Sequence, residues 1–183
     1  KGAKANLEMA LMADGVPAAE VYATLETPEG LDRAFAMLDK IKKDTIWWEA
    51  GAQPPQLLAD GEVAMTTAYN GRIFAAAVAE NKPFQVVWDG QVLEYDLFVI
   101  PKGAPNLEEA KKFVAFATDT QRLADQAKWI SYGPARKSAM LEELVYKDGK
   151  TAMAPHLPTA PENLTNALLT SSDFWVDRNA ELN

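Results

Sequence analysis

The chain predicts an α/β fold, in which short apolar strands alternate with amphipathic helices. Short apolar or alternating runs, which are typical of strands, are separated by stretches whose apolar residues recur at helical spacing. Gly, Pro, Asp and Asn fall between these runs, where turns are needed. With 183 residues, 48% of them hydrophobic, the chain can form one domain or two small lobes.

The first half of the chain gives clear helix and strand signals. Apolar spacing predicts a helix over 3–13, which Asp14 and Gly15 end. Thr27 and Pro28 are typical of a helix start, with Thr27 as the N-cap. We expect further helices at 55–60 and 71–80, and strands at 45–48, 62–68, 84–88 and 97–100.

The second half is predicted to be mainly helical. A capping-box pattern beginning at Asn106 predicts a helix to about Ala117, and Asp119 begins another to about Ile130. The run 97–100 is continuously apolar, as expected of a strand covered on both faces. The strands are few for so many helices, and the chain starts with Lys1, so we expect a piece of a longer protein. The remaining expected helices are 137–146, 161–169 and 172–182.

Composition excludes several classes of function. The net charge of −8 and the pI near 4.7 argue against binding to nucleic acid or to anionic membranes. The absence of cysteine excludes disulfides, thiolate catalysis and cysteine metal sites. The single histidine, His156, lies between prolines in a loop and is a poor candidate for a catalytic base. No nucleotide-binding or hydrolase motif is present, so we expect neither an enzyme nor a cofactor or metal.

Aromatic and charged residues stand at the ends of two expected strands. Tyr69 and Arg72 follow the run 62–68, and Asp96 precedes the run 97–100. Small ligands bind at strand ends in open α/β sheets. A ring, a guanidinium and a carboxylate there predict a site for a small charged molecule. The alternatives are a solvated Asp96, a packing role for Tyr69, and a surface position for Arg72 on the first turn of its helix.

Further residues are candidates for the same site. Trp48 ends the expected strand 45–48, and Glu94 lies two residues before Asp96. Tyr132, in a Tyr-Gly-Pro loop, is either a wall of the site or ordinary packing. An aromatic face attracts an ammonium group by about 0.5–2 kcal/mol, so several rings would favour a cationic ligand.

Four segments carry a family resemblance: Gly51–Val63, Ala68–Arg72, Tyr95–Ala104 and Tyr132-Gly133-Pro134. Together they resemble the spermidine/putrescine-type periplasmic solute-binding proteins of ABC transporters. The resemblance implies a type II periplasmic-binding-protein-like fold, in which two α/β lobes enclose the ligand. This chain then corresponds to the C-terminal half: 1–95 is the main part of lobe two, 96–143 a return segment into lobe one, and 144–183 the C-terminal helices of lobe two.

The resemblance also implies roles for individual residues. Asp96 matches an aspartate that pairs with a ligand ammonium group, and Tyr132 matches a tyrosine at the cleft. Tyr69 stands where the family usually has a tryptophan that packs on the ligand's methylene chain. Glu94 replaces a second family tryptophan. The acidic pair that binds the far amine of spermidine falls near Gly2 and Ala5, where this chain has no carboxylate.

The resulting expectation is a periplasmic protein that binds a polyamine, such as putrescine or spermidine, and delivers it to an ABC transporter permease. The alternative ligand is an ω-amino acid such as γ-aminobutyrate, with its carboxylate on Arg72 and its ammonium on Asp96, because an arginine binds carboxylates and repels polycations. A role in feeding a chemoreceptor is not separable by sequence. We also expect apolar surface on 96–143 that a missing N-terminal half or a second copy covers.

Overall fold

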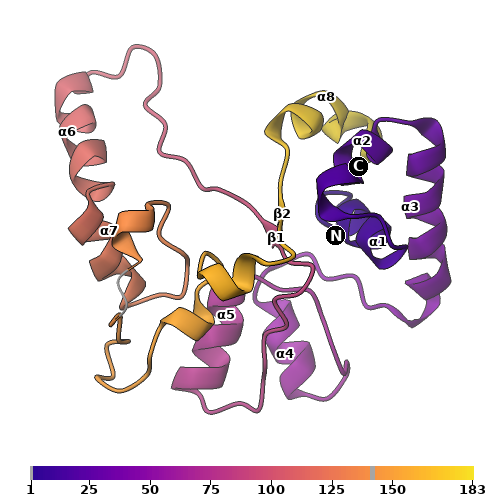
Figure 1. Ribbon diagram of the computed structural model, residues 1–183, viewed down its shortest axis with the longest axis horizontal. Coiled ribbons are helices and arrows are strands. Elements are labelled where there is room, and N and C mark those ends of the chain that lie inside the picture. Colours follow the sequence, from indigo (N-terminus) through magenta and orange to yellow (C-terminus); the bar gives the residue numbers. More distant parts are fainter. Residues whose placement is uncertain (1, 141–142) are drawn as a thin grey trace.

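The computed structural model describes residues 2–140 and 143–183, and these residues are mostly helical. Two short strands, β1 (Val92–Leu93) and β2 (Leu168–Leu169), pair in parallel, with Val92 opposite Leu168 and Leu93 opposite Leu169. In Figure 1, α1, α2, α3 and α8 form one group, α4 and α5 lie below the strands, and α6 and α7 lie at the far end. The α-helices are α1 (Asn6–Ala13), α2 (Val21–Leu25), α3 (Pro28–Ile41), α4 (Gln53–Ala59), α5 (Asn70–Phe74), α6 (Leu107–Ala117), α7 (Thr120–Ala127) and α8 (Ser172–Leu182).

Shorter helical turns link these elements. A π-helical turn, η3 (Ala75–Ala79), continues α5 directly. Among the described helices, none has both the length and the apolar character needed to cross a bilayer. The 3-10 turns are η1 (Ala18–Glu20), η2 (Lys42–Asp44), η4 (Lys137–Ala139), η5 (Ala154–His156) and η6 (Pro161–Leu164).

The N-terminal core forms where α1, α2, α3 and α8 meet. Thr27 caps α3 as predicted, since its hydroxyl accepts the N–H of Gly30 at 3.0 Å. α8 returns from the end of the chain to this core, and its N-cap is Ser171, whose hydroxyl accepts the N–H of Phe174 at 3.2 Å. The buried apolar residues of this core are Leu7, Ala10, Leu11, Val16, Val21, Leu25, Ala34, Leu168, Phe174 and Trp175.

A buried carboxylate ties three helices of the N-terminal core together. Glu8 of α1 is fully buried, and its Oε1 accepts the hydroxyl of Tyr22 at 2.8 Å and the indole N–H of Trp175 at 2.7 Å. These donors come from α2 and α8. Because a buried charge needs hydrogen-bond donors, this arrangement fixes α8 against α1.

A second core joins α5 and α7 to the segment that follows them. Its buried residues are Phe74, Ala124, Ala127, Ala139, Leu144, Tyr146, Met153, Leu157 and Ala160. A bridge between Val145 and Ala152 closes a turn in this segment. In that turn, hydrogen bonds from the Thr151 hydroxyl and from the N–H groups of Thr151 and Lys150 lower the pKa of Asp148 to about 2.

The strands expected at 45–48, 62–68, 84–88 and 97–100 are wrong for this structure, which forms no ladder in these segments. A strand is stable only when a neighbour pairs with its N–H and C=O groups, and the described residues supply a neighbour only to β1 and β2. Leu97 and Val99 are 79% and 80% exposed, so the run 97–100 is not covered on both faces. It lies in the long irregular connection between β1 and α6 (Figure 1).

Most helix predictions agree with the structure to within a few residues, with three corrections. The side chain of Asn106 makes no capping hydrogen bond to α6, so the capping box is wrong. The helix expected at 137–146 is the short turn η4 followed by the bridge at Val145, and its residues 141–142 lie outside the described residues. The helix expected at 161–169 is η6 followed by β2, because Leu168 and Leu169 pair with β1.

Candidate ligand-binding site

The first turn of α5 is held in place by the segment that follows α7. The side-chain amide of Asn70 donates to the carbonyl of Ser131 at 2.6 Å, and Ser131 is fully buried. Phe74, near the end of the same helix, packs edge-on against Tyr146 in the second core, with ring centroids 5.0 Å apart. These contacts give α5 a defined position from which its first side chains project.

Trp48 and Tyr69 form an aromatic pair beside this first turn. Their ring centroids lie 5.8 Å apart at an interplanar angle of 72°, which is the favourable edge-to-face arrangement. The indole N–H of Trp48 donates to the hydroxyl of Thr67 at 3.3 Å, which orients the ring. Tyr69 is 56% exposed, so much of its ring remains available for contact.

Arg72 borders the same aromatic pair through Gly51. A Cβ atom added to Gly51 would lie 2.9 Å from Cδ2 of Tyr69 and 3.1 Å from Nε of Arg72. The backbone of Gly51 therefore touches both side chains. Arg72 is exposed, and within residues 2–140 and 143–183 no carboxylate forms an ion pair with its guanidinium.

Tyr132 contacts the α5 turn at Gly71. A Cβ atom on Gly71 would come within 2.9 Å of Cε1 and Cζ of Tyr132, so the tyrosine ring lies directly on this glycine. Tyr132 is 41% exposed. The structure thus gathers predicted site residues around one helical turn, and we call this set the α5 cluster: Trp48, Tyr69, Arg72 and Tyr132.

The predicted acidic residues lie outside the α5 cluster. Glu94 follows β1 directly and forms an ion pair with Lys4. Asp96 is exposed in the irregular connection between β1 and α6, and no described contact joins it to the cluster. The structure therefore brings the rings and the arginine together, and it leaves the carboxylates apart from them.

The chemistry of the α5 cluster suits an anionic group next to an alkyl chain. A guanidinium without a carboxylate partner can bind a carboxylate through two parallel hydrogen bonds. The neighbouring rings offer flat apolar faces for a short methylene chain and, at their faces, attraction for a cation.

Several residues that support the cluster have no role predicted from the sequence. Gly51 and Gly71 permit the close approach of Tyr69, Arg72 and Tyr132. Asn70 holds the start of α5, and Gln53 holds the turn that contains Gly51. Pro54 and Pro55 mark a helix start, but no local pattern indicates that the Gln53 side chain accepts hydrogen bonds from the turn before it.

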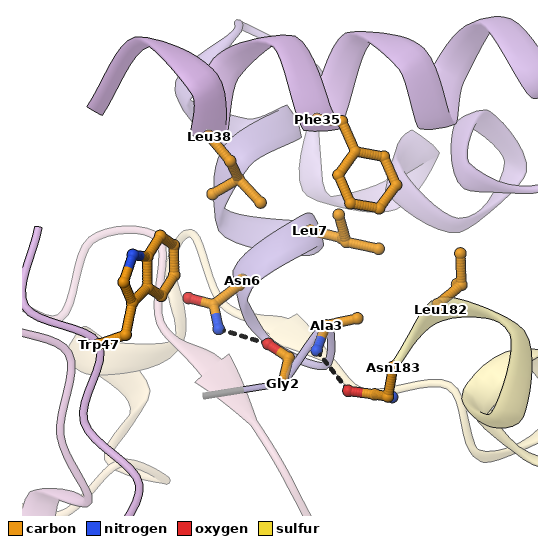
Figure 2. Close-up of a pocket in the computed structure, with 9 residues that line it drawn as sticks. All are labelled: Gly2, Ala3, Asn6, Leu7, Phe35, Leu38, Trp47, Leu182 and Asn183. Carbon is orange, nitrogen blue, oxygen red and sulfur yellow. Dashed lines mark hydrogen bonds between the residues drawn. The ribbon is translucent and has the colours of Figure 1, made fainter. Parts of the chain in front are cut away.

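A separate groove lies on the N-terminal core (Figure 2). It has a volume of about 370 Å³ and shares no residue with the α5 cluster. Its amide groups are already engaged, since Asn6 donates to the carbonyl of Gly2 and Asn183 accepts from the N–H of Ala3. The lining residues are Gly2, Ala3, Asn6, Leu7, Phe35, Leu38, Trp47, Leu182 and Asn183.

Comparison with known proteins gives consistent matches. The chain is 48% identical over 182 residues to a gamma-aminobutyric acid-binding protein of Pseudomonas aeruginosa, and this match covers 100% of the chain and 50% of the relative. The structure of an ABC transporter substrate-binding protein from Bradyrhizobium japonicum is similar, with a TM-score of 0.79, 36% identity, and coverage of 98% of this chain and 53% of that one. The structure of the Atu4243 GABA receptor is also similar, with a TM-score of 0.76, 32% identity, and coverage of 99% and 52%.

These matches decide the fold and the family. The chain spans about half the length of the relatives it matches. The structural relatives confirm the predicted fold class, which is α/β and periplasmic-binding-protein-like. This chain forms one part of such a fold. Residues 1–159 match the family described as bacterial extracellular solute-binding protein. The chain therefore belongs to the bacterial extracellular solute-binding protein family.

Proposed function

We propose that this chain is part of the periplasmic substrate-binding component of an ABC transporter, and that the ligand is an ω-amino acid such as γ-aminobutyrate. The observation that carries the proposal is the 48% identity, over 182 residues, to a gamma-aminobutyric acid-binding protein. The site chemistry agrees, because Arg72 offers a guanidinium without an ion-pair partner among the described residues. The polyamine expectation has no such support from the matched relatives.

In this proposal the ligand spans two parts of the chain. Its carboxylate binds Arg72, and its methylene groups pack on Tyr69 and Trp48, whose rings are 5.8 Å apart. Tyr132 closes the other side of the site. Asp96 supplies the counter-charge for the ammonium group when the lobes close around the ligand by hinge motion. A polyamine lacks the carboxylate and would be repelled by Arg72.

We further propose that the apolar surface on 96–143 is covered by the remaining half of the same fold. α6 has no buried residue, and Phe113 and Phe116 are 58% and 61% exposed. Contiguous exposed apolar surface of this kind marks an interface. Residues 1–183 alone should therefore bind an apolar dye and self-associate, and the complete protein should not. Fluorescence of an apolar dye and analytical sedimentation test this proposal. It would be contradicted if residues 1–183 sediment as a monomer and bind no dye.

Calorimetry on the complete protein that carries this chain tests the ligand. We expect binding of γ-aminobutyrate and weak or no binding of putrescine and spermidine. Arg72→Ala should weaken γ-aminobutyrate binding by about tenfold to a hundredfold, since a hydrogen bond to a charged group contributes about 1.5–3 kcal/mol. Arg178→Ala is the matched control, because Arg178 pairs with Glu181 on α8, away from the α5 cluster.

Two results would overturn the proposal. Tighter binding of putrescine than of γ-aminobutyrate would show that the ligand is a polyamine, as the resemblance implied. Unchanged γ-aminobutyrate binding by a folded Arg72→Ala variant would remove Arg72 from the site. Asp96→Asn tests the ammonium partner separately, and it should weaken γ-aminobutyrate binding without altering the circular dichroism spectrum.

A further inference from the structure

The turn that contains Gly51 has an internal hydrogen-bond clamp. The side-chain oxygen of Gln53 accepts the N–H of Glu49 at 2.7 Å and the N–H of Ala50 at 2.8 Å. The N–H of Gln53 donates in turn to the carbonyl of Ala50 at 2.9 Å. The following residues, Pro54 and Pro55, have fixed φ values, and Pro54 is buried. These hydrogen bonds make the turn 49–53 rigid, and we call this turn, at the start of α4, the platform.

Gly51 lies in this turn for a steric reason. Its φ angle is not in the left-handed region, so the backbone conformation does not require glycine. Close approach does require it, since any Cβ atom there would lie 2.9 Å from the ring of Tyr69 and 3.1 Å from Nε of Arg72. Real Cβ atoms do not approach ring carbons at 2.9 Å, so a larger residue would displace the ring, the guanidinium or the turn.

The turn that contains Gly51 also limits the position of the Arg72 guanidinium. Arg72 is exposed and has no ion-pair partner among residues 2–140 and 143–183, and its Nε rests against Gly51. A long side chain without a partner samples many rotamers in solution. Contact with the turn at Gly51 on one side removes part of that freedom.

We propose that Gly51 and Gln53 are positioning residues for the carboxylate subsite: they hold Arg72 and Tyr69 in the geometry that discriminates amino acids from plain amines. This inference rests on the proposed function, because it takes Arg72 as the carboxylate ligand. Neither residue touches the ligand in this arrangement. Gln53 acts by holding the turn, and Gly51 acts by its contact with Arg72 and Tyr69. A binding constellation tolerates displacements of only about 0.5 Å.

The test compares two ligands that differ in the carboxylate. Dissociation constants for γ-aminobutyrate and for n-butylamine are measured by calorimetry on the complete protein. Gly51→Ala should weaken γ-aminobutyrate binding by about tenfold and n-butylamine binding by much less, because a charge-assisted pair depends more on geometry than apolar contact does. Ala52→Ser, at an exposed neighbouring position, adds one heavy atom away from the cluster and should leave both constants unchanged.

The Gln53 series provides an independent check if Gly51→Ala does not fold. Gln53→Leu removes the acceptor of both clamp hydrogen bonds and should reduce the selectivity for γ-aminobutyrate over n-butylamine. Gln53→Glu keeps the accepting oxygen and should restore that selectivity. A merely structural role would lower both affinities together, and it would show no rescue by glutamate.

The outcomes separate this inference from the proposed function. If Arg72→Ala weakens γ-aminobutyrate binding by tenfold or more but folded Gly51→Ala and Gln53→Leu retain wild-type selectivity, the positioning role is wrong and the proposed function stands. If neither the wild type nor any variant binds γ-aminobutyrate, the proposed function fails, and the positioning role fails with it.

Discussion

α1 and α6 are both helices with apolar side chains on part of their surface, yet their environments differ sharply. Leu7 and Leu11 of α1 are fully buried in the N-terminal core. α6 buries no residue, and its Phe113 is 58% exposed. An apolar pattern therefore shows which face of a helix requires a cover, whereas the rest of the fold determines whether the chain itself supplies one.

The two helices differ in their neighbours. α1 is surrounded by α2, α3 and α8, and Glu8 binds it to two of them through Tyr22 and Trp175. α6 has looser contacts, such as the edge-on pair of Phe98 and Phe113, whose ring centroids are 5.9 Å apart. Its position at the far end of the molecule leaves its outer face open (Figure 1).

A matched pair of leucine substitutions should give the largest contrast between the two regions. In residues 1–183, Leu11→Ala should lower the free energy of unfolding by about 3–5 kcal/mol, because it leaves a cavity in a closed core. Leu97→Ala, at a side chain that is 79% exposed, should cost less than about 0.5 kcal/mol. Urea denaturation measures both values. Equal losses would show that the connection between β1 and α6 is buried in solution. A larger loss of unfolding free energy for Leu97→Ala in the complete protein would support the proposal that the missing half covers this connection.

A pair of tryptophan substitutions should give a smaller contrast. Trp175→Phe removes the indole N–H that donates to Glu8 at 2.7 Å, and it should cost about 1–3 kcal/mol of unfolding free energy. Trp129 is 66% exposed, and the ammonium of Lys147 lies 5.2 Å from its ring centroid, so Trp129→Phe should cost less than about 1 kcal/mol. Thermal denaturation distinguishes them, and a Trp175→Phe variant as stable as wild type would show that the Glu8 contact contributes little.

The alkaline pH dependence of the N-terminal core should give the smallest effect. Burial, with a further contribution from the charge of Glu8, raises the pKa of Tyr22 from about 10 to about 12. Because the folded-state pKa is the higher one, the stabilising contribution of Tyr22 is complete below pH 10 and is lost as the pH rises from about 10 to about 12. Unfolding temperatures measured across this interval should fall less steeply for Tyr22→Phe than for Tyr95→Phe, which changes an exposed tyrosine. Identical slopes would contradict the assignment.

In the candidate site too, some features follow from sequence pattern and others only from packing in three dimensions. Tyr69 and Arg72 are candidates because aromatic and charged residues follow an expected strand, and Tyr132 is a candidate because of its loop and the family resemblance. The contacts that place Tyr69 and Arg72 against Gly51 were not predictable, because close approach to a glycine depends on packing between distant segments. The separation of Asp96 from the α5 cluster also required coordinates, since the run after Asp96 forms no strand here.

Most helices, the cap at Thr27 and the apolar character of the run 97–100 follow from the sequence alone, because these features depend on interactions between residues close in the chain. The tertiary structure decided which apolar runs pair as strands and which remain exposed. A strand needs hydrogen-bond partners from a distant segment, and the described residues bring such a partner to β1 through β2 but bring none to the run 97–100. The same dependence on distant segments explains why Glu8 became a buried link between α1 and α8, a role that no local pattern in the sequence indicates.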